Sequence, residues 1–350
     1  MYYFRRNLKM GYDNLKLEKG MYRHEGMNFT QVLESLDPSE NYRGTAMEGT
    51  DAFQRQLKRF GIRVKGAGSS TVEKFFRTTD SAVLFPEYIA RTVRQGMEEN
   101  DILPAITATT TVIDSMDYRS ISSVPADEDL ELKDVEEGGT IPETSIKTKA
   151  NLVSLTKRGR MLVASYEALR FQKLDLFGVM LRQIGSYIQK QQLADAVNVI
   201  ISGDGNGNPA TQYTVGSSPI SGTKGTLKYD QLVEFWGKFD PFTMNTLLCS
   251  TGTMTSVMKI PELQNPLTGL NFQGTGKPGA PLGAQLYRTG AVADGVIIGL
   301  DNRYALELVR AGDVLVEYDK LIDRQLERAA ISSMSGFGKI CDGASAVLNV

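Results

Sequence analysis

A long apolar helix that ends in a run of glycines is the sequence feature that most constrains the fold of this chain. From Asp175 the apolar residues recur with a period near 3.6, and beyond Leu193 they occupy almost every face. The pattern stops at Gly203-Asp204-Gly205-Asn206-Gly207, where glycines permit the left-handed backbone of a helix end. A helix over 175–202 would be roughly 40 Å long, which predicts a rod that serves as the axis of a scaffold. The stripe expected to face a core consists of Phe177, Met180, Leu181, Ile184, Tyr187, Ile188 and Gln191.

The composition is that of an ordinary globular protein. With 350 residues, of which 41% are hydrophobic, the chain can form two or three lobes that each bury a core. Its 39 basic and 41 acidic side chains give a net charge of -2. Because no overall positive field results, we expect no sequence-specific binding of nucleic acid.

Groups that carry catalysis or bind metals are scarce in the sequence. His24 is the single histidine, and Cys249 and Cys341 show neither CxxC nor Cys/His spacing. This argues against a zinc site and a disulfide framework, and is typical of a protein from a reducing cytosol. We therefore predict no catalytic residue, no metal, no cofactor and no enzymatic activity, and we interpret His24 as a surface or inter-subunit contact.

Two glycine-rich stretches resemble ligand loops but lack the residues that such loops need. Counted from Asp204, a calcium loop needs Gly and Glu where Pro209 and Val215 stand. In the stretch around Gly276, a phosphate loop needs Gly where Asn271 stands and Ser or Thr where Pro278 stands. We predict neither calcium nor nucleotide binding.

No segment of the sequence predicts contact with a membrane. The longest apolar runs fall short of the ~20 residues of a membrane span, and the N-terminus lacks the apolar region of a signal peptide. The expectation is a protein that stays in the cytosol in which it is made.

The N-terminal part, residues 1–80, is polar, basic and interrupted by glycines. It predicts an extended arm with one short helix near 50–60, because such a segment can bury little apolar surface alone. Its scattered aromatic residues, such as Tyr2, Tyr3 and Phe4, would then need a surface that another subunit supplies.

The globular part begins near Ser81. Pro86 is expected at the first position of a short amphipathic helix that ends near Asn100 and presents Ile89, Val93 and Met97 on one face. Residues 105–124 and 146–155 have strand-like composition, and they flank a concentration of acidic residues, which predicts a long hairpin with an acidic tip. The acidic residues are Asp127, Glu128, Asp129, Glu131, Asp134, Glu136 and Glu137.

The C-terminal half alternates predicted helices and strands. Buried strands are expected at 245–250 and 295–300, a loop rich in Pro and Gly at 261–290, and a pair of strands at 314–318 and 325–331. The expected helices are 227–239 and 252–260.

This order of segments resembles the Hong-Kong-97-like major capsid proteins of tailed bacteriophages. Leu84-Phe85-Pro86 resembles the start of the peripheral (P) domain, the strands around the acidic tip resemble the extended (E) loop, and the long helix resembles the spine helix. Pro281-Leu282-Gly283 with the strand at 295–300 resembles the axial (A) domain. The resemblance implies an α+β fold divided as follows: N-terminal arm 1–80; P domain 81–117, 161–205 and 306–335; E-loop 118–160; A domain 206–305; and a C-terminal segment, 336–350, that returns to the A domain.

The resemblance also implies a function without turnover. The chain would self-assemble into hexamers and pentamers of an icosahedral phage head that encloses double-stranded DNA, with portal and scaffolding proteins and possible decoration proteins as partners. Assembly would occur in the host cytoplasm, and the final location would be the capsid of the virion. An encapsulin-type protein shell is the alternative of the same fold, and a hydrolase or ligand-binding enzyme is the alternative of another class.

The acidic tip is the predicted inter-subunit site. Like charges on a slender hairpin repel one another unless cations compensate them, and the cations would come from an adjacent subunit. The candidate cations are Arg5, Arg6, Arg170 and Lys173.

Overall fold

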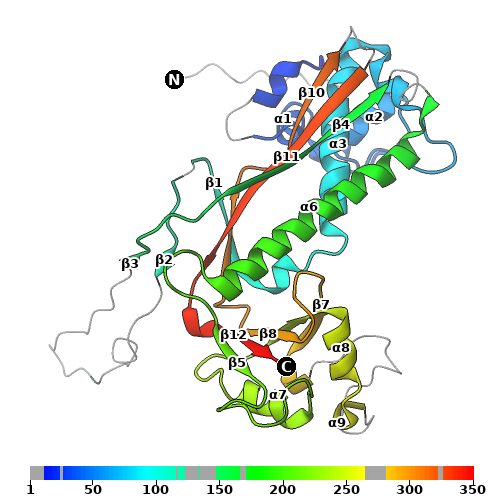
Figure 1. Cartoon of the computed structure of the whole chain (residues 1–350). Helices are drawn as coiled ribbons and strands as arrows, with labels where there is room; N and C mark the ends of the chain where they lie inside the picture. The colour runs from blue at the N-terminus through cyan, green and yellow to red at the C-terminus, as the bar shows by residue number, and fades with distance from the viewer. Residues whose placement is uncertain are drawn as a thin grey trace. The chain divides into compact units, whose positions relative to one another are not determined.

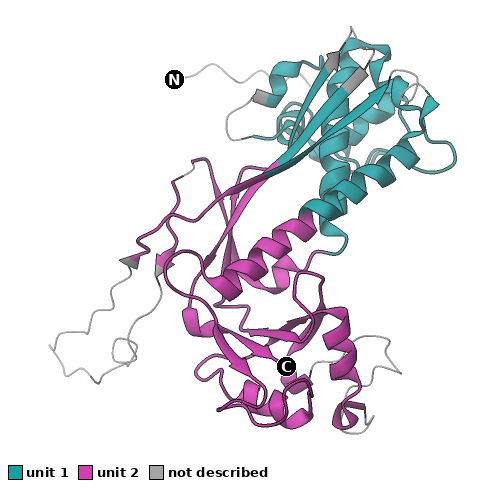
Figure 2. Cartoon of the chain, in the orientation of Figure 1, with its two compact units in different colours: residues 1–100, 158–188, 314–332 teal, residues 101–157, 189–313, 333–350 magenta. Residues whose placement is uncertain are grey.

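The structure, a computed structural model, forms two compact units. It describes residues 12–23, 27–115, 117–122, 134, 147–165, 171–264, 281–321 and 326–350. Unit 1 comprises residues 1–100, 158–188 and 314–332, and unit 2 comprises residues 101–157, 189–313 and 333–350 (Figures 1 and 2). Three of the boundaries fall inside single elements, namely the strand β4 (Thr156–Ser165), the helix α6 (Leu174–Ser202) and the strand β11 (Leu326–Lys339).

Unit 1 packs two helices against a small sheet. The helices are α3 (Thr79–Glu98) and the first half of α6. The strand β10 (Leu315–Leu321) pairs antiparallel with β11, which also pairs with β4 (Thr156–Ser165). The buried core of this unit includes Phe29, Leu33, Phe53, Leu57, Phe75, Leu84, Phe85, Ile89, Val93, Leu174 and Leu181.

Helix α3 begins earlier than the sequence predicts. Thr78 caps it, because its hydroxyl accepts from the N–H of Ser81 at 3.1 Å and its own N–H donates to the Ser81 hydroxyl at 3.2 Å. The prediction of Pro86 at the first helical position is therefore wrong, and Pro86 lies inside the helix. The predicted inward positions Ile89 and Val93 are confirmed as buried.

The Tyr22 hydroxyl, from the 3-10 helix η2 (Lys19–Arg23), forms hydrogen bonds with the backbone of α3 next to this proline. This hydroxyl donates to the carbonyl of Val83 at 2.8 Å and accepts from the N–H of Glu87 at 3.0 Å. These two groups would bond each other in a regular helix, so the hydroxyl is inserted into the backbone ladder beside Pro86.

Helices α3 and α6 approach each other through glycines. A Cβ atom at Gly96 would overlap the backbone of Arg182, and one at Gly185 would overlap the carbonyl of Val93. The Tyr88 hydroxyl also donates to the carbonyl of Leu174 at 2.9 Å. Backbone contact at this crossing needs residues without side chains at both positions.

The N-terminal part is folded onto its own chain over its described residues. It contains α1 (Phe29–Leu36) and α2 (Ala52–Arg59), each with an N-terminal capping box, and only the second matches the helix expected near 50–60. Phe29 and Phe53 are 2% and 3% exposed. The prediction of an extended arm whose aromatic residues need another subunit is therefore wrong for residues 12–23 and 27–78.

Ion pairs, one of them fully buried, hold this N-terminal part together and fix it to α3. The guanidinium of Arg55, which is fully buried, donates to Asp37 Oδ2 at 2.7 Å. Arg91 of α3 donates to Asp51 at 2.6 Å and to Glu87 at 2.9 Å. Glu87 and Arg91 are an i,i+4 pair on one helix. The other two pairs join residues 18 and 40 apart that only packing brings together, so sequence patterns did not reveal them.

Unit 2 is built around a five-stranded sheet in the order β5-β12-β8-β6-β7. The buried strands β6 (Thr246–Cys249) and β8 (Val296–Leu300) confirm the two strands predicted from the sequence, and they pair antiparallel. The other strands are β5 (Thr211–Thr214), β7 (Gln285–Arg288) and β12 (Ser345–Asn349). The helices α7 (Tyr229–Trp236), α8 (Thr251–Met258) and α9 (Pro261–Gln264) belong to the same unit.

A second group of strands in unit 2 packs on the last turns of α6. β1 (Thr107–Ile113) pairs parallel with β9 (Leu306–Ala311), which pairs antiparallel with the end of β11. Leu193, Val197 and Ile200 of α6 share a buried cluster with Leu306 and Leu308. The near-continuous apolar pattern beyond Leu193 is thus explained by burial on several sides.

Candidate inter-subunit site at the base of the acidic excursion

The predicted acidic hairpin has a short paired base. The strands β2 (Ile121–Ser122) and β3 (Lys147–Thr148) pair antiparallel, and backbone bonds of 2.9 Å from Lys149 to Ser120 and from Val153 to Tyr118 extend the pairing (Figure 1). The acidic excursion, defined here as residues 123–146, therefore leaves and rejoins unit 2 at one place.

The first leg of this base is held by a buried carboxylate on β9. Glu307, 5% exposed, accepts hydrogen bonds from Tyr118 Oη at 2.6 Å, Ser120 Oγ at 2.5 Å and Thr111 Oγ1 at 2.5 Å. Burial and the bond to this carboxylate both raise the pKa of the Tyr118 phenol. Three hydroxyl donors satisfy a charge that would otherwise be costly to bury.

The second leg is held by an ion pair to the turn after the long helix. Lys149 Nζ donates to Asp204 Oδ2 at 2.8 Å and to the carbonyl of Lys339 at 2.5 Å. The backbone N–H of Lys339 donates to the same carboxylate oxygen at 3.0 Å. These bonds thus connect the base of the excursion to the C-terminal ends of both α6 and β11.

The electrostatics of this cluster favour ionised Asp204. Burial by itself would raise the pKa of this carboxyl, but the hydrogen bonds from Lys149, Asn206 and the backbone of Lys339 lower it by more, to about 2. The ammonium of Lys339, fully buried, donates to the carbonyl of Asn208 at 2.9 Å, and its burial lowers its pKa.

The glycine run after the helix shapes this turn. Gly203, Gly205 and Gly207 have φ of +88°, +90° and +74°, which confirms the predicted left-handed backbone. The Asp204 carboxylate accepts hydrogen bonds from Lys149 Nζ and from the backbone N–H groups of Lys339 and Asn206. Among the described residues, no group of three or more His, Cys, Asp and Glu side chains is arranged to hold a metal ion.

Glycines on β11 let the base of the excursion pack closely against this strand. A Cβ atom at Gly336 would overlap the carbonyl of Ser154, and one at Gly338 would lie 3.3 Å from the Cβ of Ser120. The segment Phe337-Gly338-Lys339, at the end of β11, therefore supports the base of the excursion.

The predicted acidic and basic site residues are only partly within the described residues. Asp134 is exposed. Lys173 is also exposed, and its ammonium donates to the carbonyl of Ala67 at 3.3 Å. The structure therefore brings neither of them to a described partner of the predicted kind. The predicted site residues that lie outside the described residues are Asp127, Glu128, Asp129, Glu131, Glu136, Glu137, Arg5, Arg6 and Arg170, and the predicted contact residue His24 lies outside them too.

Sequence reasoning missed Glu307 and Lys339 as parts of this site. Both are single charged residues within apolar runs, Ala305-Leu306-Glu307-Leu308-Val309 and Phe337-Gly338-Lys339-Ile340. A lone charge in a buried strand needs a partner, and that signal could have indicated them.

Two solved structures of capsid-like particles share this fold. A virus-like particle from Pyrococcus furiosus aligns with 75% of this chain and 98% of its own, at 12% sequence identity and a TM-score of 0.50. The capsid of a native GTA particle aligns with 74% of this chain and 90% of its own, at 14% identity and a TM-score of 0.52. They confirm the predicted α+β fold of the Hong-Kong-97-like capsid class. No curated protein matches the sequence closely enough to be compared.

The family follows from the sequence itself. A family model described as phage capsid protein matches residues 148–325, just over half of the chain, and the chain belongs to this family. It is thus a structural protein of the virion capsid that associates with copies of itself, which confirms the prediction of a non-enzymatic capsid protein. The match favours a phage capsid over the encapsulin-type alternative.

The described helices also bear on the membrane prediction. None of them combines the length and the apolar character that crossing a membrane requires.

Proposed function

We propose that this chain is the major building block of an icosahedral phage head, in which hexamers and pentamers enclose double-stranded DNA. The family match and the shared fold support this proposal. The interfaces would be of the obligate kind, which bury more than ~2,000 Å² each. The division into P domain, E-loop and A domain given above is part of the proposal, with residues 12–23 and 27–78 packed into unit 1 in place of an extended arm. The pairing of β12 with β8 supports assigning residues 336–350 to the A domain.

The acidic excursion is proposed as the arm that reaches a neighbouring copy. The observation that carries this is its doubly anchored base, where Glu307 holds one leg and Asp204, through Lys149, holds the other. A segment with eight carboxylates cannot form an apolar core of its own, so fixing its root favours contact with another surface. Arg5, Arg6, Arg170 and Lys173 of that neighbour are the proposed cations.

The remaining partners follow from the same proposal. Portal and scaffolding proteins would start and guide assembly in the host cytoplasm, and decoration proteins are an optional addition. Packaged DNA would be held without sequence recognition, since the net charge of -2 supplies no overall positive field.

The test is charge reversal at the tip. We expect Asp127→Lys, Glu128→Lys and Asp129→Lys together to lower the yield of shells, seen by sedimentation and negative-stain microscopy, while circular dichroism of the subunit stays unchanged. The matched control reverses three exposed acids of unit 2, Asp230, Asp240 and Glu262, and should form shells normally.

Normal shell yield from the tip variant would refute the role of the excursion. Nuclease-resistant DNA inside shells purified from infected cells tests the phage-head function separately. Shells that hold protein cargo and no DNA would contradict it.

A further inference from the structure

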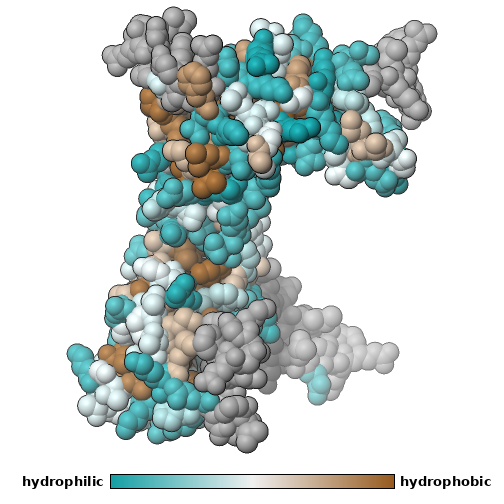
Figure 3. Space-filling model, turned by 90° about the vertical axis from the view of Figure 1, so that its right-hand side faces the viewer, coloured by the Kyte–Doolittle hydropathy of each residue, from teal (hydrophilic) through white to brown (hydrophobic). Residues whose placement is uncertain are grey.

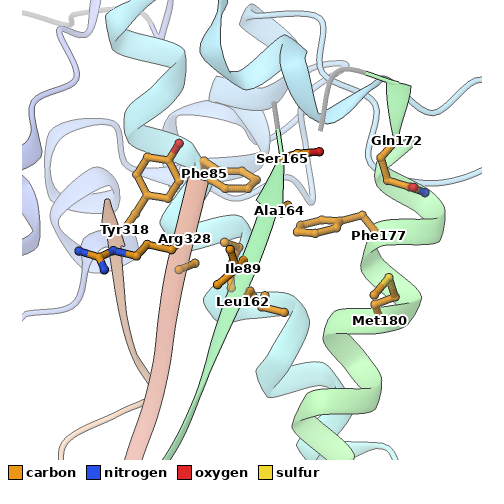
Figure 4. Close-up of a pocket in the computed structure, with 12 residues that line it drawn as sticks. Phe85, Ile89, Leu162, Ala164, Ser165, Gln172, Phe177, Met180, Tyr318 and Arg328 are labelled. Carbon is orange, nitrogen blue, oxygen red and sulfur yellow. The ribbon is translucent and has the colours of Figure 1, made fainter. Parts of the chain in front are cut away.

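Unit 1 contains an apolar pocket that the proposed function does not use. Its volume is about 340 Å³, and it lies between α3, α6, β4 and the β10–β11 pair. Figure 4 shows Phe177 and Met180 extending from α6 and Leu162 and Ala164 lying on β4. The aromatic side chains that line it are Phe85, Phe177 and Tyr318.

Exposed apolar side chains lie on α6 and β4, two of the elements that line this pocket. Met180 and Val163, which line it, are 52% and 56% exposed. Leu176 and Val179 on α6 and Met161 on β4 are exposed to a similar degree. Hydrophobic residues are grouped on the surface of unit 1 in the view of Figure 3. Such a group marks an interaction surface in a protein that associates with its own copies.

The stripe of α6 that the sequence predicts to face a core is only partly buried. Leu181 and Ile188 are buried, as predicted, whereas Met180 and Tyr187 are about half exposed, so the prediction that they face a core is wrong for the single chain. Met180, the exposed residue of the stripe that lines the pocket, offers an apolar side chain at its rim.

The walls of the pocket indicate an uncharged aromatic occupant. The ring centroids of Phe85 and Phe177 are 6.2 Å apart, and those of Phe85 and Tyr318 are 5.6 Å apart at near right angles. A further ring can add to such a cluster edge-to-face, and the sulfur of Met180 also favours aromatic contact. The one charged residue among those that line the pocket, Arg328, already pairs with Asp319 at 2.7 Å, so the pocket does not require an anion.

One segment with the uncharged aromatic side chains that the pocket favours lies outside the described residues. Tyr2-Tyr3-Phe4 is the only place in the chain with three consecutive aromatic residues. It is ten residues or fewer from Tyr12, whose carbonyl accepts from Gln56 Nε2 of α2 at 2.8 Å. Those residues can extend at most ~35 Å from that anchor.

The position of this anchor favours a neighbouring copy as the source. α1 and α2 bind the face of α3 that carries Glu87 and Arg91, through the bonds to Thr30 and Asp51. Phe85 lies two residues from Glu87, or roughly 200° around the helix, so the pocket and the anchor are on opposite faces of α3. A segment of the same chain would have to turn around α3, whereas a neighbour can approach the open side directly.

We propose that the apolar pocket of unit 1 receives Tyr2-Tyr3-Phe4 of a second copy. This deepens the proposed function, because it rests on self-association and names a contact within it. The N-terminus would then cover the exposed apolar surface of a neighbour when the shell forms.

A mixed-disulfide experiment tests this contact. Full-length Phe4→Cys chains and size-tagged Met180→Cys chains are mixed before assembly and treated with a mild oxidant. Cys249 and Cys341 are buried and stay in place. We expect a disulfide between unlike chains in shells, and severalfold less of it when Tyr187→Cys replaces Met180→Cys. Tyr187 is a matched control because it lies on the same helix and is 54% exposed, against 52% for Met180.

Three results would overturn the inference. They are shells without the cross-link, equal cross-linking at positions 180 and 187, and a disulfide within single, dilute chains of a Phe4→Cys/Met180→Cys double variant. Shell formation is recorded by microscopy in the same samples. Failure of the contact is thus distinguished from failure of self-assembly, in which the unmodified chain forms no shells.

Discussion

Lys149 and Asp204 form a buried ion pair of 2.8 Å in which the two side chains are only 6% and 2% exposed. Lys149 directly follows β3, and Asp204 lies two residues beyond the end of α6. The pair therefore fixes the returning leg of the acidic excursion to the end of the longest helix. Because removing one partner leaves an uncompensated buried charge, this contact should be sensitive to substitution.

Asp204→Asn should destabilise the subunit. The amide keeps the shape of the carboxylate but leaves the ammonium of Lys149 without its counter-charge, at a cost of about 3–5 kcal/mol. Urea unfolding followed by circular dichroism measures the change. The control is Asp319→Asn, which breaks the exposed pair with Arg328 and should cost less than ~1 kcal/mol. Similar losses in both variants would contradict a buried, structural role for Asp204.

The contribution of Asp204 should also depend on pH. Its pKa is about 2 in the folded chain against an ordinary 3.8, so the folded state binds this proton less readily than the unfolded state does. The resulting stability is fully present above about pH 4 and is lost as the pH falls toward 2, a change of about 2 kcal/mol. Comparing unfolding of the unmodified chain and of Asp204→Asn between pH 6 and pH 2 isolates it. If the difference in unfolding free energy between these two chains stayed constant down to pH 2, the lowered pKa of Asp204 would be ruled out.

The crossing of α3 and α6 should tolerate one glycine substitution and not another. Alanine at either Gly178 or Gly185 gains up to ~1 kcal/mol of helix propensity. At Gly185 the new Cβ would overlap the carbonyl of Val93, and separating the helices should cost about 1–3 kcal/mol or more. At Gly178 the nearest atom is the Tyr88 hydroxyl at 3.2 Å, which can shift. Thermal unfolding of the two variants is the measurement, and equal melting temperatures would show that the helices are not in backbone contact.

The elements that the sequence predicts well are those with a local cause. The long helix extends over 174–202 against the predicted 175–202, because an apolar period of 3.6 and a glycine stop are both written within the segment itself. The strands at 246–249 and 296–300 are short apolar runs between turn residues, and they too were predicted from local pattern.

The features that sequence analysis missed depend on residues far apart in the chain. Pro86 could be placed inside α3 only with knowledge of the Tyr22 hydroxyl, 61 residues from its acceptor Val83. Lys149 and the carbonyl of Lys339, which meet at the candidate site, are 190 residues apart. The hydrophobic periodicity of a segment carries no information about pairs of residues so far apart in the chain. The lone charges of Glu307 and Lys339 in apolar runs indicate that partners exist without indicating which ones.

The same reason explains why the N-terminal part was predicted as an extended arm, and it leads to a last prediction. The segment is polar and rich in glycine, but the apolar face of α1 completes a core that it shares with α2 and α3.

Leu33, with no exposed surface, and Leu36, 45% exposed, lie on the same helix three residues apart. We expect Leu33→Ala to cost about 2–5 kcal/mol of unfolding free energy, because it leaves a cavity in that core. Leu36→Ala should cost less than ~1 kcal/mol, since its side chain is only partly buried. Urea unfolding of free subunits measures both losses without requiring assembly. If Leu33→Ala and Leu36→Ala unfolded at the same urea concentration as the unmodified chain, the N-terminal part would contribute nothing to the subunit, and its order would have to depend on a neighbour.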